Sequence, residues 1–344
     1  MAERGLKHAL VIGDGSWGTT LALFLARNGT PCTLWSAFPE QAAEMQQKRE
    51  NTRFLAGYHL PSGITITADP YRAADGADLV VSVVPTQYLR SVAQRFEEAL
   101  PGNVPLVSAT KGLEIETFKT PSQILLEVLG ERPYCVLTGP SHAEEVVALK
   151  PAAVLAASVD RQLAQRVQAA FNSATFRVYT HDDPYGAELA GALKNVIAIA
   201  AGICDGLDLG DNAKAALLTR GMVEIARFGR SRGASAKTFF GLAGMGDLVT
   251  TCFSRHSRNR AVGEAIGRGE KLEKVLGGMR MVAEGVWTAK ALFGPEADLG
   301  DVQMPIAEQV HAVLFDGKNP REAVSELMTR TPTAEMDSLL GGLG

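Results

Sequence analysis

Short runs of apolar residues recur through the first half of the chain and alternate with helix-like segments such as 17–28 and 88–100. Such runs predict buried strands, and their alternation with helices is typical of a parallel sheet covered on both faces. The predicted strands are residues 8–12, 32–35, 79–84, 105–109, 134–137, 152–157 and 176–179. We therefore expect an α/β fold with a doubly wound parallel sheet.

The pattern changes at Asp182, Asp183 and Pro184, where an acidic N-cap candidate and a proline suited to the first turn introduce a long helix. Strand-like alternation is scarce beyond this point. The predicted helices are residues 185–204, 212–232, 258–267, 286–293 and 305–315. We therefore expect two domains, residues 1–181 with the sheet and residues 182–344 with helices alone.

The charge balance gives no reason to expect a polyanionic partner. The chain has 38 acidic against 34 basic residues, a formal net charge of −4, so we expect neither nucleic acid nor an anionic membrane as a partner. Its four cysteines are far apart and lie mostly in apolar segments, which is typical of a reducing compartment. The apolar stretch 196–204 is much shorter than the ~20 residues that cross a bilayer, and residues 1–7 do not resemble a signal peptide. We expect a cytoplasmic protein without integral membrane contact.

A glycine-rich loop separates the first predicted strand from the first predicted helix. Its first glycine permits a tight turn, its second lets the backbone approach a pyrophosphate, and its third allows close helix packing. The residues in question are Gly13, Asp14, Gly15, Ser16, Trp17 and Gly18. The strand–loop–helix setting predicts a dinucleotide site of the Rossmann type. The alternative is a glycine-rich turn that binds no ligand.

The end of the second strand does not identify the coenzyme. An NAD enzyme usually has an acid there for the ribose hydroxyls, but this chain has Ser36 and Ala37, and its next carboxylate is Glu40. Ser36 could donate to a phosphate or to a ribose oxygen, or bond to its own backbone. The coenzyme is therefore NAD or NADP.

Two lysines occupy positions where chemistry could use them. Lys111 follows the strand 105–109, at the carboxyl edge of the sheet where doubly wound folds bind ligands; the alternative is a solvated loop lysine. Lys194 lies in the middle of a helix among small and apolar residues, next to Asn195. Burial would lower its pKa and make it a base able to take a proton from an alcohol, whereas a lysine that reaches solvent would have no such role.

A third cluster combines a flexible loop with a basic helix start. Residues 244–248 contain Asp247, and the following run contains Ser257, Arg258 and Asn259. Hydroxyl, guanidinium and amide donors at a helix N-terminus can bind a phosphate, although such runs are usually solvated loops. The sequence has no metal-ligand set, no serine esterase elbow and no P-loop, so no metal is expected and hydride transfer is the remaining chemistry.

Several motifs occur in order between about His8 and Lys290, and together they resemble one family. They are residues 13–18, 108–114, 138–141, 190–195, 241–247 and 257–260. The chain resembles bacterial NAD(P)-dependent glycerol-3-phosphate dehydrogenases. The resemblance implies a Rossmann domain followed by a helical domain like that of 6-phosphogluconate dehydrogenase. It also implies reversible reduction of dihydroxyacetone phosphate to sn-glycerol 3-phosphate for phospholipid synthesis.

The resemblance also implies roles for individual residues. Lys194 would be the general acid and base, with Lys111 and Asp247 as the other catalytic residues. The implied coenzyme contacts are Gly13, Gly15, Ser16, Trp17, Gly18, Ser36, Lys111, Ala143, Arg258, Val282 and Glu284. The implied substrate contacts are Lys111, Gly139, Ser141, Lys194, Asn195, Asp247, Ser257, Arg258 and Asn259.

Two departures from the family pattern concern the coenzyme. Asp14 stands where a small neutral residue is usual, and Ser36 and Ala37 replace the commoner basic or histidine residue after the second strand. Two other functions stay open at this point: a related β-hydroxyacid or 6-phosphogluconate type of dehydrogenase, and a sensing module that binds NAD(P) without turnover. Helical second domains often pair, so we expect a homodimer.

Overall fold

The computed structural model describes residues 6–279, 281–332 and 335, and its chain forms two compact units. The first unit is Met1–Thr110 with Pro121–Pro184, and the second is Lys111–Thr120 with Tyr185–Gly344. This division differs from the expected ranges 1–181 and 182–344 because the segment 111–120 packs with the helices. The Phe118 ring lies 6.1 Å from the Phe228 ring, and the Arg232 guanidinium lies 5.6 Å from the Phe118 ring. The outer ends of the expected ranges, 1–5 and 336–344, lie outside the described residues.

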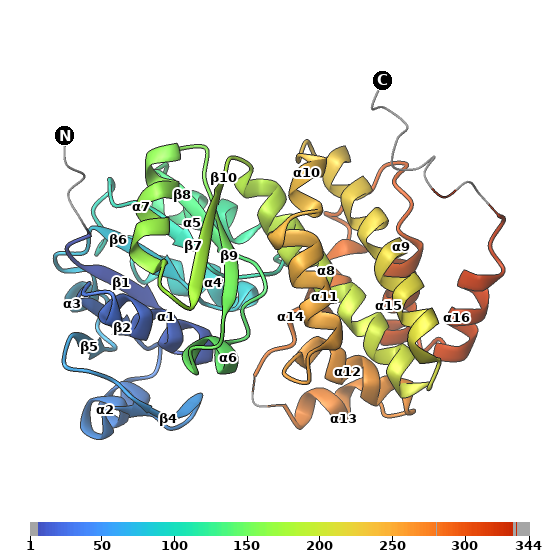
Figure 1. Ribbon diagram of the computed structural model, residues 1–344, viewed down its shortest axis with the longest axis horizontal. Helices are drawn as coiled ribbons and strands as arrows, with labels where there is room; N and C mark the ends of the chain where they lie inside the picture. Colours follow the sequence, from blue (N-terminus) through green and yellow to red (C-terminus); the bar gives the residue numbers. More distant parts are fainter. Residues whose placement is uncertain (1–5, 280, 333–334, 336–344) are drawn as a thin grey trace. The chain divides into compact units, whose positions relative to one another are not determined.

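The first unit contains an eight-stranded sheet with the strand order β10-β9-β8-β7-β6-β1-β2-β5 (Figure 1). Its strands are β1 (Ala9–Ile12), β2 (Cys32–Trp35), β5 (Ile64–Thr67), β6 (Leu79–Ser82), β7 (Leu106–Ser108), β8 (Tyr134–Thr138), β9 (Ala152–Ala157) and β10 (Phe176–His181). A separate antiparallel pair joins β3 (Glu50–Asn51) and β4 (Leu55–His59).

One neighbouring pair in the large sheet departs from the predicted parallel arrangement. The pair β8 and β9 is antiparallel, whereas the other six pairs are parallel. The helix between these two strands, α6 (Ala143–Val147), has five residues and is too short to carry the chain back along the sheet. The predicted parallel sheet is confirmed for these six pairs, and the antiparallel pair of β8 and β9 is an exception that the sequence pattern did not indicate.

The sheet separates two hydrophobic cores. Side chains alternate along β1, so that Ala9 and Val11 join one core while Leu10 and Ile12 join the other. Residues of α1, α6 and α7 complete the first core, and residues of α3, α4 and α5 complete the second. The helices are α1 (Ser16–Arg27), α2 (Pro39–Lys48), α3 (Pro70–Ala74), α4 (Thr86–Gln94), α5 (Pro121–Leu129), α6 and α7 (Arg161–Phe171). The predicted doubly wound fold, with helices on both faces of the sheet, is confirmed.

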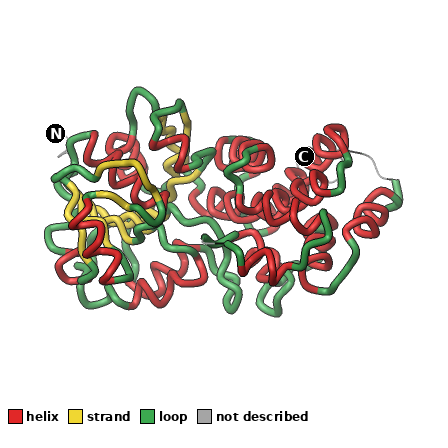
Figure 2. Tube along the Cα trace, turned by 90° about the horizontal axis from the view of Figure 1, so that it is seen from below, coloured by secondary structure: helices red, strands yellow, loops and turns green. Residues whose placement is uncertain are grey.

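The second unit has helices and no strand in its described part (Figure 2). Its elements are α8 (Pro184–Gly206), α9 (Gly210–Ser231), α10 (Ala236–Phe239), the π-helix η1 (Leu242–Gly246), α11 (Asp247–Phe253), α12 (Arg258–Gly267), α13 (Leu272–Gly277), α14 (Glu284–Leu292), α15 (Pro305–Phe315) and α16 (Pro320–Met328). Among the described residues, α8 alone has the length and apolarity of a membrane span. Its most apolar 18-residue window is 100% buried within the structure, as in the core helix of a folded unit.

Glycines bring α8 and α12 into backbone contact. A Cβ on Gly202 would overlap the carbonyl oxygen of Arg260, and a Cβ on Gly263 would overlap the carbonyl oxygen of Ile199. Neither position has room for a side chain, so the two helix backbones pack directly against each other. This close packing fixes the distance between the side chains that the two helices direct toward each other.

Candidate functional site

The glycine loop of the first unit has the backbone that a dinucleotide requires. Gly13 follows β1 with φ +110°, a value that favours glycine, and its N–H donates to the carbonyl of Trp35 at 3.1 Å. A Cβ on Gly18 would overlap the carbonyl of Gly13, which explains the need for glycine where α1 meets the loop. A Cβ on Gly15 would meet nothing within 4 Å, so the backbone is open at the start of α1. The loop therefore fits a pyrophosphate against the helix N-terminus.

The two residues between these glycines begin α1. Ser16 is buried, and the ring of Trp17 packs edge-on against Phe176 of β10 at 6.3 Å. Trp17 therefore anchors α1 to the sheet through its side chain. Gly15, the N-cap of α1, supplies no capping side chain, and the first turn carries no acidic residue. An anion would meet the positive end of the helix there.

Asp14 and Ser36 meet at the end of β2. Ser36 is fully buried and donates to Asp14 Oδ2 at 2.8 Å. Ser36 Oγ also accepts from the N–H of Phe38 at 3.2 Å, so it contacts both the glycine loop and its own loop. Burial raises the pKa of Asp14, while the Ser36 hydrogen bond and the charge of Arg53 oppose that rise. The Asp14 side chain is thus directed to the end of β2.

The other predicted contacts in the first unit follow β8. Gly139 has φ +139°, and a Cβ on it would come within 3.0 Å of the Cα of Val154. Ser141 Oγ donates to the carbonyl of Gly139 at 2.9 Å, which closes the turn before α6. Ala143 is the first residue of α6 and is buried. These three residues form one turn at the carboxyl end of a sheet strand.

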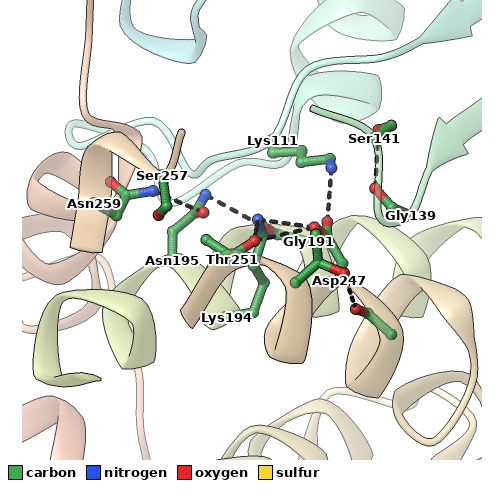
Figure 3. Close-up of polar contacts among 12 residues, drawn as sticks. Lys111, Gly139, Ser141, Gly191, Lys194, Asn195, Asp247, Thr251, Ser257 and Asn259 are labelled. Carbon is green, nitrogen blue, oxygen red and sulfur yellow. Dashed lines mark hydrogen bonds and ion pairs between the residues drawn. The ribbon is translucent and has the colours of Figure 1, made fainter. Parts of the chain in front are cut away.

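Three residues far apart in the sequence form a charged centre in the second unit (Figure 3). Lys111 Nζ lies 2.6 Å from Asp247 Oδ2, and Lys194 Nζ lies 3.1 Å from Asp247 Oδ1. The side chains of Lys194 and Asp247 are 6% and 4% exposed, whereas that of Lys111 is 20% exposed. One carboxylate thus faces two ammonium groups, which leaves a net positive charge in a buried setting.

Local structure explains how each member reaches this centre. Lys194 lies in the middle of α8, where its neighbours on all sides are buried. Asp247 is the first residue of α11, directly after the π-helix η1. A π-helix inside a helical run is frequently found at functional sites. Lys111 belongs to the 111–120 segment that packs with the second unit.

Burial and charge shift the proton affinities of this centre. Burial is the main cause that lowers the pKa of Lys194 to about 8, helped by the charge of Lys111 and opposed by Asp247. For Asp247 burial alone would raise the pKa, but the two lysines reverse this and hold it below its usual value. Asp247 therefore stays ionised, and Lys194 can exchange a proton near neutral pH.

A polar chain between helices lies beside Lys194. Asn259 Nδ2 donates to Asn195 Oδ1 at 2.8 Å, and Asn259 Oδ1 accepts from the N–H of Gly285 at 2.9 Å. The backbone contact between α8 and α12 permits this bond, and Asn195 Nδ2 also donates to the carbonyl of Gly191 at 3.3 Å. Asn195 and Asn259 thus link α8, α12 and the start of α14.

The remaining predicted residues of the basic cluster differ in exposure. Ser257 is buried and caps α12 by accepting from the N–H of Arg260 at 3.2 Å. Arg258 is exposed, and its Nη1 donates to the carbonyl of Val282 at 2.8 Å. Glu284 begins α14 two residues later. Arg258 is therefore the residue of this cluster whose charge reaches solvent.

Sequence reasoning missed two residues that organise these sites. Thr251 Oγ1 accepts from Lys194 Nζ at 2.6 Å and donates to Asp247 Oδ1 at 3.1 Å, so it bridges the pair. Its position four residues after Asp247 in a helix is a signal that could have found it. Asn51 Nδ2 donates to the carbonyl of Asp14 at 2.6 Å and contacts Thr19 Oγ1 at 2.8 Å, which fixes the glycine loop. No local pattern marks Asn51.

Two family models match the chain. The NAD-dependent glycerol-3-phosphate dehydrogenase N-terminus covers residues 8–164, and the NAD-dependent glycerol-3-phosphate dehydrogenase C-terminus covers residues 183–325. The glycerol-3-phosphate dehydrogenase (NAD(P)+) of Geobacter metallireducens is 51% identical over 328 residues, which are 94% of this chain and 98% of the relative. That of Geobacillus thermodenitrificans is 49% identical over 338 residues, which are 97% of this chain and 98% of the relative.

Solved structures agree with these sequence relatives. The glycerol-3-phosphate dehydrogenase of Coxiella burnetii matches with a TM-score of 0.90 and 37% identity, over 95% of this chain and 99% of that chain. A probable 2-dehydropantoate 2-reductase from Bacillus subtilis, with a TM-score of 0.57 and 16% identity over 91% of this chain and 100% of that chain, shares the fold alone. The chain belongs to the NAD-dependent glycerol-3-phosphate dehydrogenase family.

Proposed function

We propose that this protein is an NAD(P)-dependent glycerol-3-phosphate dehydrogenase, which reduces dihydroxyacetone phosphate reversibly to sn-glycerol 3-phosphate for phospholipid synthesis. The observation that supports it best is the buried Lys194, whose pKa is lowered to about 8 and which is held by Asp247 and Thr251. A buried lysine whose pKa lies near neutral pH is suited to proton transfer, because both its charged and its neutral form are accessible there. The relatives are named glycerol-3-phosphate dehydrogenases, and this name indicates the substrate on which Lys194 would act.

The nicotinamide, when bound, would supply the hydride to the carbonyl carbon of dihydroxyacetone phosphate, or accept it from the same carbon in the oxidation. The Lys194 ammonium donates its proton to the carbonyl oxygen of dihydroxyacetone phosphate, and the neutral amine takes it back in the oxidation. Asp247 fixes Lys194 and Lys111 at 3.1 and 2.6 Å, so neither lysine has to reorganise during the reaction. Lys111 adds positive charge beside the oxygen that becomes an alkoxide.

The substrate phosphate pairs with Arg258, whose exposed guanidinium can donate two parallel hydrogen bonds. Ser257, Asn259 and Asn195 hold the start of α12 against α8 and thereby position that arginine. The other proposed substrate contacts are Lys111, Gly139, Ser141, Lys194, Asn195, Asp247, Ser257 and Asn259. The proposed coenzyme contacts are Gly13, Gly15, Ser16, Trp17, Gly18, Ser36, Lys111, Ala143, Arg258, Val282 and Glu284.

In the proposal, the first unit provides the glycine loop for the dinucleotide, and the second provides the proton-transfer centre. We also propose a cytoplasmic homodimer without nucleic-acid or integral membrane contact. Four buried free cysteines support a reducing compartment, and the net charge of −4 speaks against polyanionic partners.

The test is the initial rate of dihydroxyacetone phosphate reduction with NADH and with NADPH, for the wild type and for Lys194→Ala. We expect Lys194→Ala to lower kcat by about two to four orders of magnitude, the usual contribution of a general acid. Lys214→Ala is the matched control, because Lys214 is also a buried lysine of the second unit but pairs with Asp205 at 2.8 Å.

Three results would contradict the proposal. Wild-type rates in Lys194→Ala would remove that lysine from the reaction. Turnover of keto acids without turnover of dihydroxyacetone phosphate would indicate a related hydroxyacid dehydrogenase. Tight coenzyme binding with no turnover of either substrate would indicate a sensing module.

A further inference from the structure

The end of β2 lacks the acid that usually marks an NAD site. In doubly wound folds an Asp or Glu about 20 residues after the glycine loop accepts a hydrogen bond from the adenosine ribose. Here β2 ends at Trp35, and Ser36 follows with a fully buried hydroxyl. The strand itself therefore offers no carboxylate to the ribose.

A carboxylate nevertheless lies at this place, because Asp14 extends from the glycine loop to Ser36. Its Oδ2 accepts from Ser36 Oγ at 2.8 Å, and its side chain is almost fully buried. Asn51 fixes the backbone of Asp14 by donating to its carbonyl at 2.6 Å. Gln41 Nε2 in turn donates to Asn51 Oδ1 at 3.1 Å, so α2 supports the same position.

We infer that Asp14 replaces the missing acid of β2, accepts a hydrogen bond from the adenosine ribose hydroxyls, and makes the enzyme select NAD(H) over NADP(H). This inference rests on the proposed dinucleotide site at the glycine loop. A carboxylate held there accepts a hydrogen bond from a ribose hydroxyl. It repels the 2′-phosphate of NADP(H), because the carboxylate and the phosphate are both negatively charged and the site is partly dehydrated.

Two arginines near the same loop offer a competing attraction for a 2′-phosphate. The Arg53 guanidinium lies 5.6 Å from the Phe38 ring and 4.9 Å from the Phe54 ring, and its charge acts on Asp14. The Arg95 guanidinium lies 4.5 Å from the Trp35 ring, and its Nη1 donates to the carbonyl of Ala37 at 3.4 Å.

We expect the repulsion of a 2′-phosphate by Asp14 to exceed its attraction by these arginines. Both arginine side chains are exposed, so water and salt screen their charge, and both already stack on aromatic rings. The Asp14 carboxylate is buried and therefore less screened. Arg53 also helps to keep that carboxylate ionised, because its positive charge opposes the effect of burial.

The test measures coenzyme binding to the full chain by isothermal titration calorimetry with NADH and with NADPH. We expect the wild type to bind NADH at least about tenfold more tightly, since a hydrogen bond to a charged group is involved. Asp14→Asn should lose NADH affinity by about tenfold or more and leave NADPH affinity unchanged or improved. Asp14→Ala serves as a second variant, and thermal melting monitored by circular dichroism confirms that each is folded.

Glu40→Gln is the matched control, because Glu40 is the next carboxylate along the chain after β2 and lies exposed in the first turn of α2. It should bind both coenzymes like the wild type. The inference is overturned if the wild type binds NADPH as tightly as NADH, or if both Asp14 variants weaken the two coenzymes equally. A wild type that prefers NADPH would also overturn the inference. A specific loss of NADPH affinity in Arg53→Ala or Arg95→Ala would then assign the preference to that arginine.

The reduction of dihydroxyacetone phosphate is measured separately from coenzyme binding. Reduction of dihydroxyacetone phosphate without a coenzyme preference would leave the proposed function intact and defeat the inference about Asp14. Selective NADH binding without reduction of dihydroxyacetone phosphate would support the inference about Asp14 and contradict the proposed function.

Discussion

The proton-transfer role of Lys194 predicts how the rate depends on pH. Burial lowers the pKa of Lys194 to about 8. Reduction requires the ammonium form, so its rate should fall as pH rises through about 8, by about tenfold for each further pH unit. Oxidation requires the neutral amine, so its rate should rise through the same pH. The two directions should therefore show opposite limbs with one common midpoint.

Replacing Asp247 by asparagine should move this midpoint to lower pH, because the carboxylate favours the charged form of Lys194. Lys194 Nζ and Asp247 Oδ1 are 3.1 Å apart. At an effective dielectric constant of about 20, two unit charges at that separation attract each other by about 5 kcal/mol. Relaxation and water entry reduce the net effect, so we expect a shift of at least about one pH unit, equivalent to ~1.4 kcal/mol.

The assay is kcat/KM for both directions from about pH 6 to about pH 10, for the wild type and for Asp247→Asn. Asp205→Asn is the control, because Asp205 also pairs with a buried lysine but lies in a different ion-pair network, with Lys214 and Arg260. It should leave the midpoint in place. An unchanged midpoint in Asp247→Asn would refute the reasoning. A wild-type reduction rate that stays flat from about pH 7 to about pH 9, about one unit on either side of the midpoint of about 8, would refute it too.

Three further predictions concern the second unit. Thr251→Val should lower kcat by about tenfold or more while Thr251→Ser retains activity, because the hydroxyl bonds Lys194; steady-state rates of the two variants decide this. Burial raises the pKa of Glu224 from 4.5 to about 7, so wild-type stability to urea should decline as pH rises across that interval, and Glu224→Gln should lack this slope. Gly263→Ala should lower both Tm and kcat because a Cβ there overlaps α8, whereas Gly277→Ala, with open space around it, should change neither; equal melting temperatures for the two variants would contradict the packing argument.

Much of the first unit follows from the sequence because its strands are buried on both faces. Continuous apolar runs predict β2 and β9 to the residue, Cys32–Trp35 and Ala152–Ala157. The strand β5 was missed because Ile64–Thr67 alternates isoleucine with threonine and contains no apolar run. The helix expected at 88–100 is α4, Thr86–Gln94, after which the backbone continues in turns with Arg95 N–H bonded to Val92.

The types of residue in the charged centre were predictable, but their arrangement was not. Lys194 is conspicuous because a lysine among buried small residues is rare. Lys111 and Asp247 are 136 residues apart, and only the folded chain brings Lys111 Nζ to 2.6 Å from Asp247. The direction of Asp14 toward Ser36 was equally hidden, since it depends on Asn51 and on the turn at Gly13. Nothing in the sequence alone distinguishes a carboxylate facing the phosphates from one facing the ribose.

The segment Lys111–Thr120 has a consequence for synthesis of the chain. It is joined at both ends to the first unit but packs with the second. Lys111 leaves the ribosome 136 residues before its partner Asp247, so the charged centre cannot form until most of the helices exist. A fragment that begins at Tyr185 would lack this lysine and leave Asp247 with Lys194 as its only ammonium partner among the described residues. The stretch of sequence that encodes the first unit therefore also encodes a segment that the second unit needs for its charged centre.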